Sequence, residues 1–189
     1  MLDLYKEHRH AAVREGFQIL LRADAELWLP TGMEKTEEYY RRTADACMKW
    51  AEEAEGERLR ADYLWLEDNR ERSRFRAYTY RLECRPVWQT ETHAAWVCDS
   101  SLHGKDGECF TRRSAQVWDL REQMLLPFGQ ILRLCKWKDR KKRPPFRPDG
   151  VYPEREELVF FRNSDRAGEI MEFRVPYGER ESAPATEAP

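Results

Sequence analysis

The spacing of apolar side chains predicts a helix at the start of the chain. Across residues 3–29 apolar groups recur at intervals of three and four, which places them along one face of a helix. This stripe contains Val13, Phe17, Leu20, Leu21 and Trp28. The sequence "LPTG" at 29–32 then interrupts the pattern, because proline and glycine disfavour a continuing helix. We therefore expect a long first helix over residues 3–29.

A second helical pattern begins after this break. Thr36 can serve as its N-cap, with acidic residues in the first turn. The apolar stripe that follows contains Tyr40, Ala44, Cys47, Ala51 and Ala54. Gly56 either ends this helix or weakens it on the way to Leu66, since a glycine inside a helix costs only about 1 kcal/mol.

From Arg74 onward the period of the pattern changes to two. In "RFRAYTYRLECR" apolar residues alternate with charged or small ones, as in a strand with one buried face. The alternation occupies residues 74–85, 92–101 and 108–120. Between the last two segments "LHGKDG" has the composition of a hairpin turn. These segments predict an antiparallel meander, followed by short helical turns that Pro127 interrupts.

The last part of the chain predicts two more strands and a tail. The strands are expected at 152–163 and 169–177, whereas residues 179–189 have no apolar side chain larger than alanine and are expected to be disordered. The predicted fold class is α+β, with two N-terminal amphipathic helices packed on one face of an antiparallel sheet of about five strands, a meander plus a C-terminal hairpin. We expect residues 1–178 to form a single domain.

Charge and composition narrow the class of protein. The chain has 33 basic and 35 acidic residues, so its net charge of -2 gives no global attraction to phosphate or to an anionic membrane. Its apolar runs are far shorter than the roughly 20 residues that span a bilayer, and the N-terminus has no signal-peptide pattern. We predict a cytoplasmic protein without membrane contact.

The cysteines have no arrangement typical of a disulfide framework or a metal site. They are five in number, with no C-x-x-C pair: Cys47, Cys84, Cys98, Cys109 and Cys135. An odd number without close pairs suits a reducing compartment, so we interpret them as small buried hydrophobes or inert surface thiols. A cross-strand contact between Cys84 and Cys98 is the one pairing that deserves a check.

The most strongly charged stretch is "LCKWKDRKKRPPFRP" at 134–148. It could neutralise phosphates while Trp137 and Phe146 stack on unpaired bases. It could equally be a proline-stiffened connector whose charge keeps a neighbouring sheet edge from pairing with another molecule. Because the chain as a whole is slightly acidic, we interpret it as a connector that binding could have recruited.

No motif for catalysis or metal binding emerges from the spacing. His103 lies in a predicted turn with Asp106 and Glu108, which lacks the three or four ligands that zinc needs. His93 and Asp99 lie with serines on one predicted strand whose side chains alternate between faces, so they cannot form a relay. We predict no cofactor, no metal and no enzymatic activity.

Several strings resemble a bacterial domain of unknown function. They are "AQVWDLREQMLLPFGQIL" (115–132) and "EELVFFRNSDRAGEIMEFRVPY" (156–177), with Asp119-Leu120, Leu125, Leu126, Phe128, Gly168 and Pro176-Tyr177 in similar places. That domain ends lysozyme-sensing anti-sigma factors and some peptidoglycan deacetylases, and the resemblance covers residues 36–178. It implies lysozyme or cell-wall binding. Of the family's Gly-Gly-Ala-His-Gly turn, this chain keeps only His103-Gly104.

These observations favour a non-enzymatic binding or scaffold domain that recognises another macromolecule, a protein first of all, through sheet-connecting loops. Trp88 and Trp137 fall outside the strand periodicity, which makes them candidates for a surface contact. The predicted binding residues are Trp88, His103, Lys136, Trp137, Lys138, Arg140 and Lys141. One alternative is single-stranded nucleic-acid binding by residues 133–147, and a further one is a hydrolase of cell-wall chemistry. The pattern does not indicate an oligomeric state.

Overall fold

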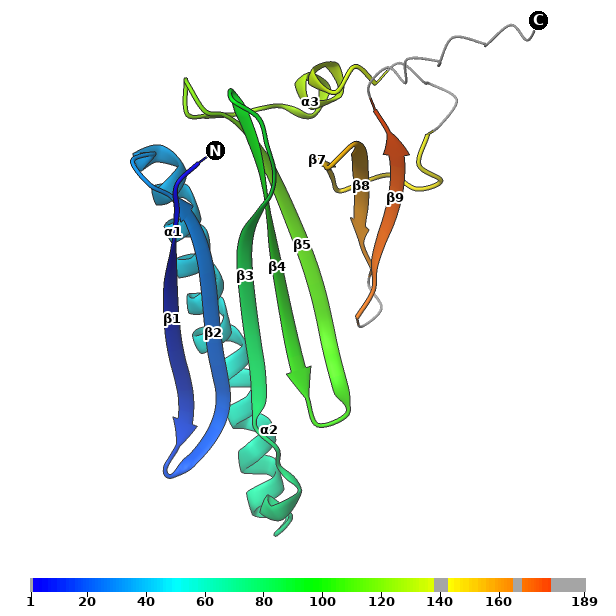
Figure 1. Ribbon diagram of the computed structural model, residues 1–189. Coiled ribbons are helices and arrows are strands. Elements are labelled where there is room, and N and C mark those ends of the chain that lie inside the picture. Colours follow the sequence, from blue (N-terminus) through cyan, green and yellow to red (C-terminus); the bar gives the residue numbers. More distant parts are fainter. Residues whose placement is uncertain (1, 138–142, 165–167, 178–189) are drawn as a thin grey trace, which may run out of the picture.

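The computed structural model describes residues 2–137, 143–164 and 168–177, and it is built mainly from strands (Figure 1). The strands of the first sheet are β1 (Leu4–Glu15), β2 (Gln18–Pro30), β3 (Tyr78–Gln89), β4 (His93–Gly104), β5 (Gly107–Asp119) and β6 (Met124–Leu125). Those of the second are β7 (Gly150–Glu154), β8 (Glu157–Asn163) and β9 (Ile170–Pro176). The helices are α1 (Glu34–Trp50), the π-helical turn η1 (Ala51–Glu55), α2 (Gly56–Asp68), the 3-10 turn η2 (Arg72–Arg74) and α3 (Phe128–Leu134).

The predicted first helix is wrong, because residues 3–29 form the β1–β2 hairpin. Burial along β2 alternates from Leu21 to Leu29, with alanines and leucines buried and Arg22 on the opposite face. A period of two is the signature of a strand, and the alanines, which favour helices locally, fit here because they lie beneath the packed helix. Phe17, counted in the helical stripe, is fully exposed at the hairpin turn, where Gly16 adopts a φ of +55°.

The second predicted helix is present and continues past Gly56 to Asp68. Its N-cap is Met33, so the prediction of Thr36 as the cap is wrong: Thr36 lies inside α1 and is fully buried. The turn η1 shifts the phase of the stripe, and this places Ala54 in solvent although its spacing predicted burial. Gly56 packs closely against β1, since a Cβ at this position would lie 3.0 Å from Cγ2 of Val13.

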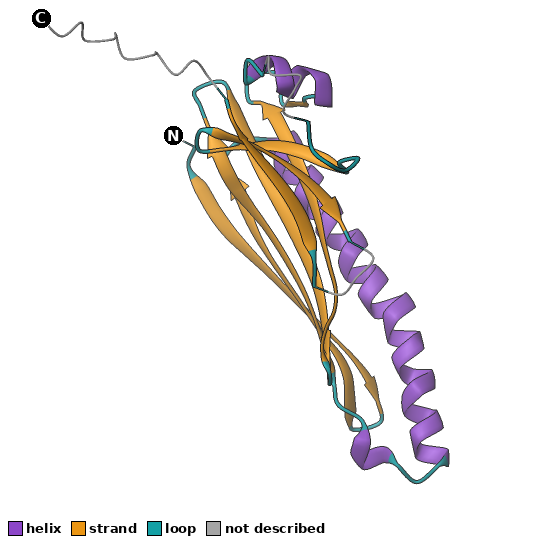
Figure 2. Ribbon diagram, turned by 90° about the vertical axis from the view of Figure 1, so that its right-hand side faces the viewer, coloured by secondary structure: helices purple, strands orange, loops and turns teal. Residues whose placement is uncertain are grey.

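The first sheet has the order β1-β2-β3-β4-β5-β6, and all its neighbours are antiparallel except β2 and β3. That pair is parallel because α1, η1 and α2 form the crossover between the two strands. The helix runs along one side of the sheet (Figure 2) and packs chiefly against β2. The predicted meander over β3, β4 and β5 is present, but as the inner part of a larger sheet.

The C-terminal strands form a separate sheet in the order β7-β8-β9 instead of extending the first one. This sheet covers the face of β3–β5 opposite the helix, where Ala95, Val97 and Val117 point into a shared core with Val159 and Phe160. The prediction of two helices on a single five-strand sheet is therefore wrong. The predicted tail, 179–189, lies outside the described residues, and the prediction of one domain stays a prediction.

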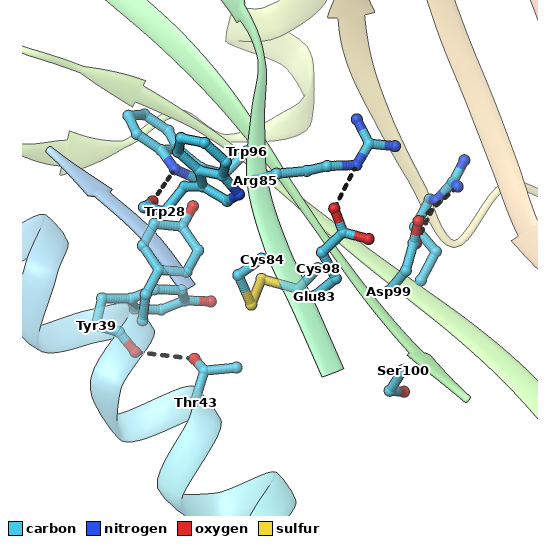
Figure 3. The surroundings of a disulfide bond; sticks show 12 residues. Trp28, Tyr39, Thr43, Glu83, Cys84, Arg85, Trp96, Cys98, Asp99 and Ser100 are labelled. Atoms are coloured by element: carbon cyan, nitrogen blue, oxygen red, sulfur yellow. Dashed lines mark hydrogen bonds and ion pairs between the residues drawn. A yellow bond between two sulfur atoms is a disulfide. The ribbon is translucent and has the colours of Figure 1, made fainter. Parts of the chain in front are cut away.

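A disulfide joins Cys84 of β3 to Cys98 of β4, directly opposite each other in the register (Figure 3). Both residues are buried in the core between the sheet and the helix. The expectation that all five cysteines are unpaired is therefore wrong. Cys47, Cys109 and Cys135 are free thiols.

Candidate binding cleft

A cleft opens between the continuous helix formed by α1, η1 and α2 and one end of the sheet. This end carries Tyr78 of β3, Leu102 of β4 and Phe110 of β5, and we call it the lower half of these strands. The helix packs chiefly against β2, and the cleft lies between it and the part of the sheet that carries Leu102 and Phe110. The volume of this cleft is about 760 Å³, within the range of about 300–1,000 Å³ that is typical of ligand sites. We call it the aromatic cleft, and the residues that define it are Cys47, Trp50, Tyr78, Tyr80, Phe110 and Arg112.

Three rings form the apolar part of the aromatic cleft. The indole of Trp50 lies 5.8 Å from the ring of Tyr80 and 5.5 Å from that of Phe110, measured between centroids, with an edge-on arrangement to Phe110. Trp50 is 39% exposed although its neighbours are aromatic. Such packing fixes each ring while part of the indole stays in contact with solvent, which suits contact with a ligand.

The charged groups of the aromatic cleft are held by an ion pair. Glu55, at the end of η1, is buried and accepts a hydrogen bond of 2.9 Å from Nε of Arg58. The Arg58 guanidinium also lies 5.5 Å from the centre of the Tyr78 ring. Hydrogen bonding to Glu55 raises the pKa of Arg58, so the guanidinium keeps its charge.

Tyr80 on the floor of the cleft stays protonated at neutral pH. Burial raises its pKa, and the neighbouring Cys47 raises it further. A phenol in this state is a hydrogen-bond donor and not a base.

A second cavity, which we call the upper cavity, continues the aromatic cleft along α1. Its volume is about 730 Å³, and Ala46 lines both cavities. Tyr39, Trp118, Met124 and Leu125 supply apolar side chains to it. Met124 is 60% exposed and Leu125 41% exposed, which is unusual for side chains of this size. Together the two cavities form a groove between the helix and β5.

The structure brings Trp88 and Trp137 to the same core but places His103 away from them. Trp88 and Trp137 are both partly buried and pack against the second core, and the Trp137 ring lies 5.6 Å from that of Phe160. His103 is near the end of β4, eight residues beyond the position that pairs with Trp88, which is about 26 Å along a strand. Its Nε2 atom lies 3.1 Å from the hydroxyl of Ser101.

The basic stretch is described only in part. Lys136 has a positive φ of 50° directly after α3. Lys138, Arg140 and Lys141 lie outside the described residues. Nucleic-acid binding by residues 133–147 therefore stays a prediction.

Sequence reasoning missed the residues that define the aromatic cleft. Trp50 was omitted from the helical stripe because it lies beside that stripe, at the start of the phase shift in η1. Phe110 falls inside the predicted strand 108–120 and was not among the candidate binding residues. The available signal was the pair Glu55 and Arg58, an acid three positions before a base near Trp50 on the helix.

The described part of the chain has neither a cluster of metal ligands nor a membrane-spanning helix. Among the described residues no three His, Cys, Asp or Glu side chains gather in a way that would hold a metal ion. Within the same ranges, no helix has both the length and the apolar character needed to cross a membrane.

Comparison with known proteins places the chain by its fold. No sequence model of a known family matches it, and no curated protein is detectably similar in sequence. It is similar in structure to a DUF3298 family protein from Pseudomonas aeruginosa PAO1, with a TM-score of 0.60 and 10% identity over 93% of this chain and 91% of that one. A DUF3298 family member from Bacteroides fragilis gives a TM-score of 0.57 and 10% identity over 95% and 94% of the two chains.

These likenesses show that the chain has a fold found in domains of unknown function. The predicted resemblance to such a domain is confirmed in that general form. The setting in anti-sigma factors and deacetylases stays a prediction, because these neighbours do not address it.

Proposed function

We propose that this chain is a non-enzymatic binding domain that holds part of another protein in the aromatic cleft. The observation that carries the proposal is the exposure of Trp50 against Tyr80 and Phe110 in a cavity of about 760 Å³. Tryptophan and tyrosine dominate binding energy at protein interfaces because they bury a large area at a low cost in rotamer entropy. The contact surface differs from the sheet-connecting loops that the sequence suggested.

The chemistry of the aromatic cleft favours binding over catalysis. Its buried carboxylate, Glu55, is engaged by Arg58, and Tyr80 is held in its protonated form. Acid–base catalysis needs a group whose pKa lies near the working pH. The described lining residues include no second carboxylate to act with Glu55, so the cell-wall hydrolase alternative gains no support from this cleft.

A selection from a displayed library of random peptides tests this proposal. We expect peptides recovered on the wild-type chain to lose at least about thirtyfold in affinity for Trp50→Ala, the loss typical of an interface hot spot. Trp65→Ala is the matched control, because Trp65 is in the same helix, is 62% exposed and lies outside the cleft. Circular dichroism checks that both variants are folded. Peptides that bind Trp50→Ala as tightly as the wild type would contradict the proposal.

The predicted cytoplasmic location remains a proposal, and the disulfide bears on it. Structural disulfides persist in oxidising compartments and are rare in the cytosol. Trapping free thiols in freshly lysed source cells tests the point. If Cys84 and Cys98 are alkylated without prior reduction, the cytoplasmic location is supported, and if they are protected until a reductant is added, it is not.

A further inference from the structure

The groove between the helix and β5 combines apolar lining with a local excess of positive charge. The aromatic cleft and the upper cavity meet at Ala46 and are therefore in line along the helix. Their charged lining residues are four cations, Lys35, Arg42, Arg58 and Arg112, against two carboxylates, Glu38 and Glu55. This excess is opposite in sign to the net charge of -2 of the whole chain.

Two of these cations have no carboxylate partner in the part of the chain that the structure describes. Arg42 pairs with Glu38 and Arg58 with Glu55, whereas no carboxylate in the described residues pairs with Lys35 or Arg112. The Arg112 guanidinium instead lies 5.8 Å from the centre of the Phe110 ring. Lys35 is at one end of the groove and Arg112 is in the aromatic cleft at the other, so each end presents an available positive charge beside apolar side chains.

The length of the groove indicates the shape of its occupant. Lys35 and Arg58 are 23 positions apart on one continuous helix, which corresponds to about 35 Å. A compact small molecule would fill one of the two cavities. An extended chain rises about 3.3 Å per residue and would span both with about ten residues.

The outer edge of β5 is paired with β6 at Trp118 and Asp119, so backbone bonds to an occupant could form only on the part nearer Gly107. The side chain of Asn163 already bonds to this edge at Arg113, donating to its carbonyl over 3.0 Å and accepting from its N–H over 2.6 Å. Backbone groups point to the same side at every second residue of a strand. Thr111 therefore presents its N–H and C=O to this edge, and in the described part of the chain no residue bonds to them.

We propose that the occupant of this groove is an extended acidic segment of about ten residues from a partner protein, with one large apolar side chain in each cavity. This inference rests on the proposed function and specifies the partner. The apolar side chains provide most of the affinity, and the Asp and Glu residues pair with Lys35 and Arg112. Because these two cations are at opposite ends, they place acidic residues of the segment near both ends of the groove.

Sequencing the winners of the peptide selection tests the inference separately from the proposed function. We expect winners rich in Asp and Glu, carrying two aromatic or large aliphatic residues. A winner synthesised with a fluorescent label should bind Arg112→Glu about tenfold more weakly, and added salt should weaken its binding to the wild type. Arg22→Glu, on an exposed position of β2 outside the groove, is the matched control.

The outcomes distinguish the two proposals. Selected peptides whose binding depends on Trp50 but whose sequences are neutral or basic would overturn the inference and leave the proposed function standing. The same holds for selected peptides whose affinity for Arg112→Glu equals that for the wild type. Winners that ignore Trp50→Ala would overturn both. A dimer of the chain that is lost in Trp50→Ala by analytical ultracentrifugation would show a second copy as the occupant, and this too would overturn the inference.

Discussion

The two halves of strands β3–β5 have different surroundings: the upper half, which carries Trp96, and the lower half, which lines the aromatic cleft. In the upper half β4 is buried on both faces, by the helix on the side of Trp96 and by the second sheet on the side of Val97. In the lower half the same strand carries Leu102 and Ser100 on the floor of the aromatic cleft. Burial on both faces leaves no room for a ligand in the upper half. One end of the sheet therefore provides rigidity, and the other end provides the wall of a cleft.

The largest effect is expected from Trp96→Ala in the upper half. Trp96 is fully buried, and its indole N–H donates a 2.9 Å hydrogen bond to the carbonyl of Trp28. Removing it should lower the free energy of unfolding by about 4 kcal/mol, because a large cavity forms and an acceptor loses its partner. Denaturant titration measures the loss. Trp65→Ala, at an exposed position of α2, should cost less than about 1 kcal/mol, and equal losses would show that burial of Trp96 does not set the cost.

Loss of the disulfide should be the next largest effect. Cys84 and Cys98 are 14 residues apart in sequence, and opening a loop of this size costs about 3 kcal/mol in the chain-entropy account. We expect that decrease in the unfolding free energy for the double variant Cys84→Ala/Cys98→Ala, together with insensitivity to reductant. Cys109→Ala, which removes an exposed free thiol, is the control. A wild type whose stability does not change on reduction would contradict the prediction.

Arg113→Met should weaken the attachment of the second sheet. Arg113 donates to Asp99 at 2.6 Å and to the hydroxyl of Tyr152 at 3.0 Å, and it also bonds to Glu172. Leaving these partly buried groups without their partner should cost about 2 kcal/mol at neutral pH. The control is Arg22→Met, which should change stability by less than about 0.5 kcal/mol.

The stability difference between the wild type and Arg113→Met should depend on pH, and this dependence provides a second check. Burial raises the pKa of Glu172, but hydrogen bonds from Arg174 and Arg113 outweigh it and lower the pKa below the ordinary value of 4.5. A carboxyl group with a lowered pKa stabilises the folded state above its ordinary value, and this contribution is lost as the pH falls through the folded pKa. The difference in unfolding free energy between the wild type and Arg113→Met should therefore become smaller below pH 4.5. A gap that widens in acid would contradict this assignment.

The smallest effect is expected from Gly56→Ala, at the first residue of α2, where the helix packs against β1. Alanine favours a helix by about 1 kcal/mol over glycine, but its Cβ would lie 3.0 Å from a methyl group of Val13. We expect the two effects to offset each other, leaving the unfolding free energy within about 0.5 kcal/mol of wild type. Thermal unfolding measures the difference. A large loss would show that β1 cannot yield beneath the helix.

Local patterns were sufficient for the elements whose surroundings are simple. The alternation in β3 and the stripe with Tyr40 and Ala44 predicted a strand and a helix because one face of each meets a core. For the β1–β2 hairpin the local pattern gave the wrong element, because its alanines fit a helix as well as a strand. The candidate site could not be predicted from Trp88 or Trp137, since exposure depends on which core covers a residue and not on its periodicity.

The sequence by itself determined that a helix follows the break at 29–32, that a meander comes after it and that the charges nearly balance, because local spacing and composition are sufficient for these. Tertiary structure alone decided that β2 and β3 run parallel, that Cys84 meets Cys98 and that the last strands form their own sheet. It also decided that Trp50, Phe110 and Arg112 face one cleft. These features depend on contacts between residues far apart in the chain, which packing selects and no local pattern encodes.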